Sequence, residues 1–206
     1  MKICVCIPAQ DTVLTTFFVD CTNMFFYSRN KGIDISFNQM NGCYLDLLRN
    51  QLMQSALKTN PDYILMLDSD MRFPANTMER LAAHDKEVVG CNYTRRRADF
   101  SPIACTFEDP NKRVDPSQVS GLGKVSLLPT GIMMLKPSVL ARIKYPWFEN
   151  IWRKSDNRLV GEDVVFCAKV QEEAKTVVYC DHDLSREVAH SGQMDYTIPM
   201  ICEGSK

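Results

Sequence analysis

The chain has 206 residues, a formal net charge of −1 and 45% hydrophobic residues. This length and apolar content fit one globular domain with an ordinary core. The near-zero net charge argues against a protein whose main partner is nucleic acid or a membrane surface. No apolar run approaches the roughly 20 residues of a membrane span. We therefore expect a single domain over residues 1–206, alone or as one module of a longer polypeptide.

Nine cysteines, an odd number, are spread along the chain without a Cys-x-x-Cys pair. Several lie within apolar runs, among them Cys4, Cys6, Cys91 and Cys180. Free, mostly buried thiols are typical of a reducing compartment, whereas a disulfide framework or a zinc site needs paired cysteines. The apolar start of the chain is too short for a signal peptide. These features predict a cytoplasmic protein.

Strand and helix patterns alternate along the chain. Short apolar or β-branched runs predict strands at residues 3–7, 33–37, 63–67, 88–91, 125–128, 132–135 and 176–180. Apolar residues at helical spacing predict helices at residues 12–30, 44–58, 74–84, 137–143 and 164–174. We expect Pro8 to stop the first strand, Asp11 to cap the first helix and residues 38–42 to form a turn. Residues 108–123 have the composition of a loop. The alternation predicts an α/β fold with a parallel sheet.

The central motif is the stretch from Tyr63 to Pro74. Residues 63–67 are all apolar or aromatic, which is typical of a strand covered on both faces. Asp68 and Asp70 follow at the carboxyl end of that strand, where open α/β sheets bind their ligands. Two carboxylates so close favour a nearby cation, and hard oxygen ligands suit Mg²⁺ or Mn²⁺ that hold nucleotide phosphates. A polar turn or a helix cap is the alternative for this pair.

Other polar residues have two interpretations. Arg49 and Asn50 lie in the middle of a predicted helix, on a solvated face or at a site. The arginines at 95–97 are either solvated or able to bind phosphate oxygens bidentately. Asp163 begins a helix, where the dipole favours a carboxylate, so simple capping is the alternative to a catalytic role. The aromatic residues of segment 145–152 belong to the core or a lid, or form a platform on which sugars stack.

In this order and spacing, the motifs resemble those of the GT-A glycosyltransferases, especially the family 2-like members. The residues that carry the resemblance are Arg49-Asn50, the stretch 63–74, Thr130-Gly131, Gly161-Glu162-Asp163 and His190. The resemblance implies an α/β fold of the GT-A, Rossmann-like type, with a mostly parallel central sheet flanked by helices. Domains of this size and type also occur in phages and large DNA viruses, so a viral source is consistent with it.

The resemblance also implies a reaction. A sugar would pass from a nucleotide-diphosphate sugar, most simply a UDP-sugar, to a hydroxyl group of a glycan, a protein-linked glycan or another acceptor. A nucleic acid acceptor is less favoured. Asp70 would bind the metal directly, His190 would complete its protein ligands, and Asp68 would face the ribose or a metal-bound water. A neutral imidazole suits Mn²⁺ better than Mg²⁺. His182 is a second candidate ligand, ranked below His190.

The resemblance assigns the remaining site residues as well. Asp163 would be the general base that removes the acceptor's proton in an inverting transfer, with Glu162 the neighbour most easily mistaken for it. The residues expected to contact the donor are Pro8, Ala9, Gln10, Asp11, Arg49, Asp68, Ser69, Thr130 and Gly131.

Three other functions are weaker matches to the residues. A sugar-1-phosphate nucleotidyltransferase needs a glycine-rich loop after the first strand, and residues 8–11 contain no glycine. A haloacid-dehalogenase-type phosphatase places its Asp-x-Asp on the first strand, whereas here two predicted strands and two predicted helices precede the motif strand. The main alternative is a non-catalytic module that binds a nucleotide sugar or a glycan, which would not need Asp163.

Overall fold

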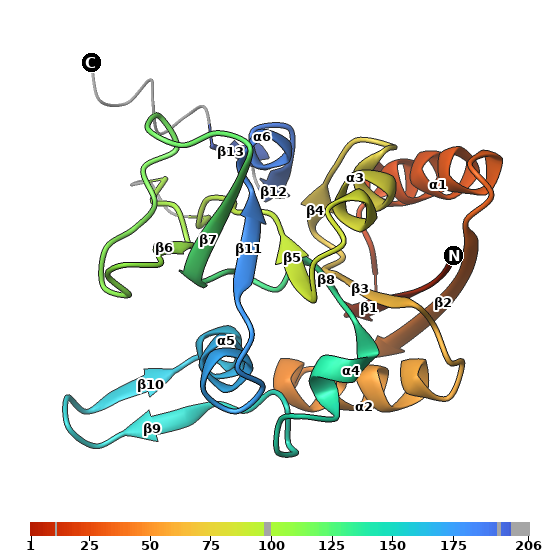
Figure 1. The fold of residues 1–206 in the computed structure, drawn as a ribbon. Coiled ribbons are helices and arrows are strands. Elements are labelled where there is room, and N and C mark those ends of the chain that lie inside the picture. Colours follow the sequence, from red (N-terminus) through yellow and green to blue (C-terminus); the bar gives the residue numbers. More distant parts are fainter. Residues whose placement is uncertain (11, 97–99, 193–194, 199–206) are drawn as a thin grey trace.

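The computed structural model describes residues 1–10, 12–96, 100–192 and 195–198. Its centre is an eight-stranded sheet with the order β2-β1-β3-β8-β5-β11-β7-β6 (Figure 1). In that order the strands are Asp34–Asn41, Lys2–Ala9, Tyr63–Leu67, Ile132–Leu135, Val88–Gly90, Val178–Asp181, Leu122–Leu127 and Cys105–Thr106. β8 runs antiparallel to β3 and β5, and β7 runs antiparallel to β11 and β6. The other six strands share one direction, so the predicted, mostly parallel sheet is confirmed.

Helices cover both faces of this sheet (Figure 1). One face carries α1 (Thr15–Asn30), α3 (Thr77–Ala83) and α6 (His182–Ser185), and the opposite face carries α2 (Leu45–Leu57), α4 (Pro137–Leu140) and α5 (Glu162–Glu172). Each face has its own cluster of buried apolar side chains. Successive residues of a strand point to opposite faces, so β3 supplies both clusters, and all five of its residues are buried, as the unbroken apolar run predicts.

Two small sheets lie outside the main one. β4 (Met71–Arg72) pairs antiparallel with β12 (Ala189–Ser191), which pairs with β13 (Asp195–Thr197). β9 (Ile151–Arg153) and β10 (Arg158–Val160) form a hairpin that projects beside α5 and leads directly into it (Figure 1). No helix in the described part of the chain combines the length and the apolar character that crossing a bilayer requires.

Several predicted boundaries are wrong, each for a local reason. β1 continues through Pro8 and Ala9, because both pair in register with β2, and β2 continues to Asn41 where a turn was expected. β2 is an edge strand, so its polar residues can face solvent. α3 begins at Thr77 rather than at Pro74, because β4 follows the Asp-x-Asp motif first. Asp11, the expected helix cap, lies outside the described residues; Leu14 is the N-cap of α1.

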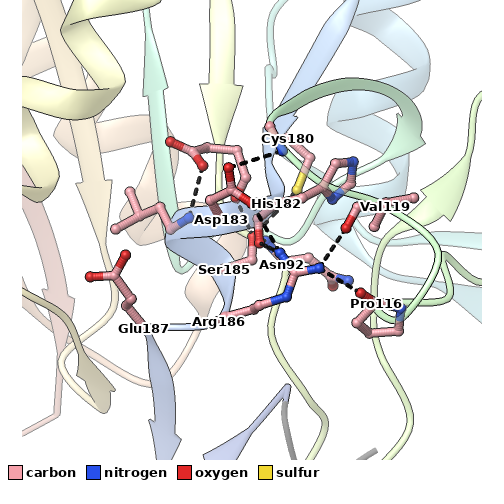
Figure 2. A network of polar contacts seen from close by, with 12 residues as sticks. Asn92, Pro116, Val119, Cys180, His182, Asp183, Ser185, Arg186 and Glu187 are labelled. Carbon is pink, nitrogen blue, oxygen red and sulfur yellow. Dashed lines mark hydrogen bonds and ion pairs between the residues drawn. The ribbon is translucent and has the colours of Figure 1, made fainter. Parts of the chain in front are cut away.

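The second half of the long loop before β7 is held against α6 (Figure 2). The Arg186 guanidinium donates to the carbonyl oxygens of Pro116, at 2.7 Å, and of Val119. The Asp183 carboxylate accepts from the backbone N–H of Gly121 at 3.0 Å. These bonds fix the chain where it enters β7. The eight cysteines in the described residues are all free, as the sequence predicts.

Candidate active site

A short backbone ladder brings the two expected metal ligands together. β4 follows the Asp-x-Asp motif directly, and its pairing with β12 sets His190 opposite Met71. The backbone N–H of Ser191 donates to the Asp70 carbonyl oxygen at 2.7 Å. As a result His190 Nε2 lies 3.3 Å from Asp70 Oδ2, although the two residues are 120 positions apart in the sequence.

The geometry of this pair fits a divalent cation. His190 Nδ1 lies 3.1 Å from the Thr94 carbonyl oxygen, which can accept only from a protonated Nδ1. In the neutral imidazole, the Nε2 lone pair then faces a carboxylate oxygen, and the two repel unless a proton or a cation lies between them. Ligands at about 2.1 Å from one ion in octahedral geometry are roughly 3 Å apart, close to the separation here. Among the described residues, no three or more His, Cys, Asp or Glu side chains lie together in a way that could hold a metal ion, so the pair would be completed by other ligands.

Asp70 also contacts an arginine that the sequence interpretation left open. Arg96 Nη2 lies 3.1 Å from Asp70 Oδ2, and Arg96 Nη1 donates to the Ser191 carbonyl oxygen at 3.1 Å. Burial by itself would raise the pKa of Asp70, but the contact with His190 and the positive charge of Arg96 lower it overall. The carboxylate is thus held ionised, as a metal ligand must be.

A buried arginine connects Asp68 with the start of α5. Arg49 is 2% exposed; its Nη2 donates to both oxygens of Asp68, at 2.8 and 2.9 Å, and its Nη1 pairs with Glu162. Burial raises the pKa of Glu162, while Arg49 acts in the opposite direction. The solvated face considered for Arg49 and Asn50 is therefore wrong. The Asn50 amide instead binds the backbone of Trp147 and Phe148, at 2.9 Å from Trp147 N and 2.6 Å from Phe148 O.

Gly131 packs directly against Asp68. Its carbonyl oxygen accepts from the Asp68 N–H at 2.9 Å, and its own N–H donates to the Tyr93 hydroxyl at 2.9 Å. A Cβ atom at this position would collide with the Tyr93 ring and lie 3.1 Å from Asp68 Oδ2. Thr130, beside it, is 2% exposed. Glycine is thus required for close packing under the Asp-x-Asp motif.

We expect Gly131→Ala to destabilise the protein by about 1–3 kcal/mol, the usual cost of overpacking a filled site. The check is chemical denaturation of the variant and of the double variant Gly131→Ala/Tyr93→Phe. Removal of the hydroxyl relieves part of the collision, so the double variant should lose less stability than the two single changes added together. Additive losses would show that Tyr93 does not limit the space at this position.

Asp163 lies in the first turn of α5, as the sequence predicts. It is partly buried, and its Oδ1 accepts from the N–H of Val164 at 2.7 Å. The N-cap of α5 is Gly161, so Asp163 does not occupy the N-cap position. Its neighbour Glu162 pairs with Arg49, whereas Asp163 makes no ion pair with the residues that the structure describes. Of the two adjacent carboxylates, Glu162 is therefore the one held by an ion pair with a described residue.

A cavity of about 470 Å³ opens where β1, β2 and β3 end. Parallel strands bring their carboxyl ends to one edge of a sheet, and this cavity lies at that edge. Its lining includes six of the predicted residues, namely Pro8, Ala9, Gln10, Asp68, Ser69 and Asp70, together with Arg96, Ser191 and Gly192. Its volume lies within the range of small-molecule sites, roughly 300–1,000 Å³.

The remaining candidates lie behind the cavity or elsewhere. The candidates that are not among its lining residues are Arg49, Thr130, Gly131, Asp163 and His190. Arg49 and Gly131 hydrogen-bond to Asp68, and Thr130 is buried next to Gly131. Asp11, predicted to contact the donor, lies outside the described residues. His182, the second metal candidate, packs against Gly123 of β7 and does not line the cavity either. Burial and the nearby Arg186 charge lower its pKa, which favours a neutral ring.

The aromatic residues of segment 145–152 do not all have the same surroundings: some belong to the core and others are exposed. Phe148 stacks on Phe166 of α5 at 4.5 Å between ring centroids, and the Trp147 indole N–H donates to the Leu140 carbonyl oxygen at 3.0 Å. Both rings are buried and belong to the core, whereas Trp152 of β9 is half exposed. The sequence analysis assigned no role to Tyr93. The run of arginines at 95–97 was the one feature of the sequence that pointed to Arg96 as a site residue.

Comparisons with known proteins agree with this architecture. The profile of the Anp1 family, a GT-A-like mannosyltransferase family, matches residues 25–110, which is less than half of the chain. A197 from the virus STIV has a similar structure, with a TM-score of 0.62 and 18% identity over 93% of this chain and 86% of that one. This likeness shows a shared fold, a mixed α/β domain with a large central sheet flanked by helices.

Two more distant structures were also found. A glycosyltransferase involved in glycosylation of the major capsid of PBCV-1 has a TM-score of 0.38 and 12% identity, over 71% of this chain and 69% of that one. A Drosophila β-1,4-galactosyltransferase 7 mutant in complex with manganese, UDP-Gal and xylobiose has a TM-score of 0.45 and 13% identity, over 87% and 63%. No curated protein sequence matches this chain.

Proposed function

We propose that this protein is a divalent-metal-dependent glycosyltransferase that moves a sugar from a nucleotide-diphosphate sugar to an acceptor hydroxyl group. The observation that carries the proposal is the convergence of Asp70 and His190, at 3.3 Å, beside the cavity at the carboxyl ends of the parallel strands. A sugar nucleotide is a small molecule of a size that such a cavity can hold. The negative charge of its diphosphate requires a cation, which Asp70 and His190 would hold.

The residues around the cavity have separate roles in this proposal. Asp70 and His190 hold the ion, with Mn²⁺ favoured because one ligand is an imidazole. When bound, that ion would stabilise the negative charge on the departing nucleoside diphosphate. Arg49 fixes the position of the Asp68 carboxylate. In this position Asp68 would bind the ribose hydroxyls or a water molecule on the ion. The end of β1, at Pro8 and Ala9, and Gln10 after it contact the nucleotide.

Asp163 removes the proton from the acceptor hydroxyl in this proposal. The oxygen then attacks the anomeric carbon from the face opposite the diphosphate, and the configuration is inverted. A UDP-sugar is the proposed donor, and a glycan or a protein-linked glycan the proposed acceptor. The free thiols fit a reducing compartment, so the cytoplasm is the proposed location.

The function is tested with purified protein, Mn²⁺ and a panel of nucleotide sugars, by measuring released nucleoside diphosphate with and without simple glycan acceptors. We expect slow hydrolysis of one donor, faster release with a suitable acceptor, and loss of both in Asp70→Ala because the ion loses its charged ligand. Substitution of exposed Asp156, which pairs with Arg153 on the β9–β10 hairpin, to Ala is the control for removal of a carboxylate elsewhere. Binding of a donor without turnover on any acceptor would instead support a non-catalytic binding module.

A further inference from the structure

Arg96 reaches into the cavity from the segment that follows β5. It contacts Asp70 Oδ2 at 3.1 Å and the Ser191 carbonyl oxygen at 3.1 Å, and all three residues line the cavity. Its side chain is 46% exposed, so the guanidinium is not fixed by packing. Among the lining residues that the structure describes, Arg96 is the one lysine or arginine, whereas Asp68 and Asp70 are both acidic.

Arg96 and a divalent ion would compete for one oxygen atom. Asp70 Oδ2 already lies 3.3 Å from His190 Nε2 and 3.1 Å from the Arg96 guanidinium. An ion held between Asp70 and His190 takes up a lone pair of that oxygen, and its two positive charges repel a guanidinium at the same contact. Binding of the ion therefore weakens the contact between Arg96 and Asp70.

A nucleoside diphosphate supplies a new partner at the same place. Its phosphate oxygens carry more negative charge than the single positive charge that is left once Asp70 has bound the ion. Arginine binds phosphate bidentately through two parallel N–H donors. The half-exposed side chain already lies in the cavity next to Asp70, where it would contact phosphate oxygens of a bound nucleotide.

We propose that Arg96 is a further donor-binding residue, which occupies Asp70 in the free protein and transfers to the diphosphate when ion and nucleotide bind. This inference rests on the proposed function, since it concerns the same site. It predicts opposite effects of one substitution on two ligands. Without Arg96, the ion alone binds more tightly because a competitor is gone, and the diphosphate binds more weakly because a partner is gone.

The test is isothermal titration calorimetry of the full chain and of Arg96→Gln, with Mn²⁺ alone and then with UDP at saturating Mn²⁺. For Arg96→Gln we expect roughly two- to fivefold tighter Mn²⁺ binding, the size of an exposed ion pair. We expect roughly 10- to 100-fold weaker UDP binding, the size of a hydrogen bond to a charged group. Uridine, which has no phosphate, should bind the two proteins equally.

Two further variants separate a specific role from a general one. Arg95→Gln removes a neighbouring charge that does not line the cavity, and it should change neither affinity. Arg96→Lys keeps the charge without the bidentate geometry and should restore UDP binding in part. Unchanged affinities in Arg96→Gln, or a parallel loss of both ligands, would overturn the inference while leaving the transferase in place. A wild-type protein that binds neither Mn²⁺ nor UDP would overturn the proposed function itself.

Discussion

Asp163→Asn is expected to lower sugar transfer by roughly 10²–10⁴-fold, the usual contribution of a general base, while leaving the affinities for UDP and Mn²⁺ unchanged. The amide has the shape of the carboxylate, and its oxygen can still accept the 2.7 Å hydrogen bond from the Val164 N–H. It cannot take a proton from the acceptor hydroxyl. The measurement is the rate of transfer at saturating donor and acceptor, together with calorimetric titration of UDP and Mn²⁺.

Glu162→Gln is the matched control for this change, because it neutralises the adjacent carboxylate. Glu162 pairs with buried Arg49, so we expect this variant to lose thermal stability, whereas Asp163→Asn should retain it. Loss of UDP binding in Asp163→Asn would show that Asp163 binds the donor or stabilises the fold, and does not act as the general base. An undiminished transfer rate would remove the general base from the proposed mechanism.

Arg49→Met is expected to destabilise the protein by about 3–5 kcal/mol, the cost of removing one partner from a buried ion pair. Arg49 is 2% exposed and neutralises both Asp68 and Glu162, whose side chains are 22% and 15% exposed. Without it, two largely buried carboxylates face each other with no positive charge between them. Urea denaturation at neutral pH measures the loss. Arg29→Met, at an exposed ion pair with Asp34, should cost at most about 1 kcal/mol.

The loss in Arg49→Met should depend on pH in a defined direction. Burial already raises the pKa of Glu162, and without the guanidinium, which acts in the opposite direction, that pKa lies further above the value in the unfolded chain. Between these values the folded state binds more protons, so the stability of the variant rises as the pH falls. The difference from wild type should be smaller at about pH 5 than at about pH 8. A difference that does not change with pH would assign the loss to packing alone.

The sequence predicts best where one local pattern dominates. The unbroken apolar run of β3 indicates a strand buried on both faces, and the position of Asp68 and Asp70 at its carboxyl end follows from that. The resemblance also singles out Gly131 and the carboxylates at the start of α5, and their roles at the site stay predictions. Each of these depends on a few consecutive residues.

Features that depend on distant partners could not be predicted in the same way. Nothing near Arg49 in the sequence shows that it is buried, since its partners Asp68 and Glu162 lie 19 and 113 residues away. β4 has only two residues and exists because β12 pairs with it. The contact of Arg96 with Asp70 likewise depends on the path of the chain after β5. Tertiary pairing, and not local propensity, decides such cases.

The ladder between β4 and β12 also determines when the site is complete. All eight strands of the main sheet precede residue 182, whereas His190 belongs to a strand that comes after them. Because a chain emerges from the ribosome amino end first, Asp70 leaves the exit tunnel well before His190 does. A nascent chain would then have only one of the two proposed ion ligands until β12 pairs with β4.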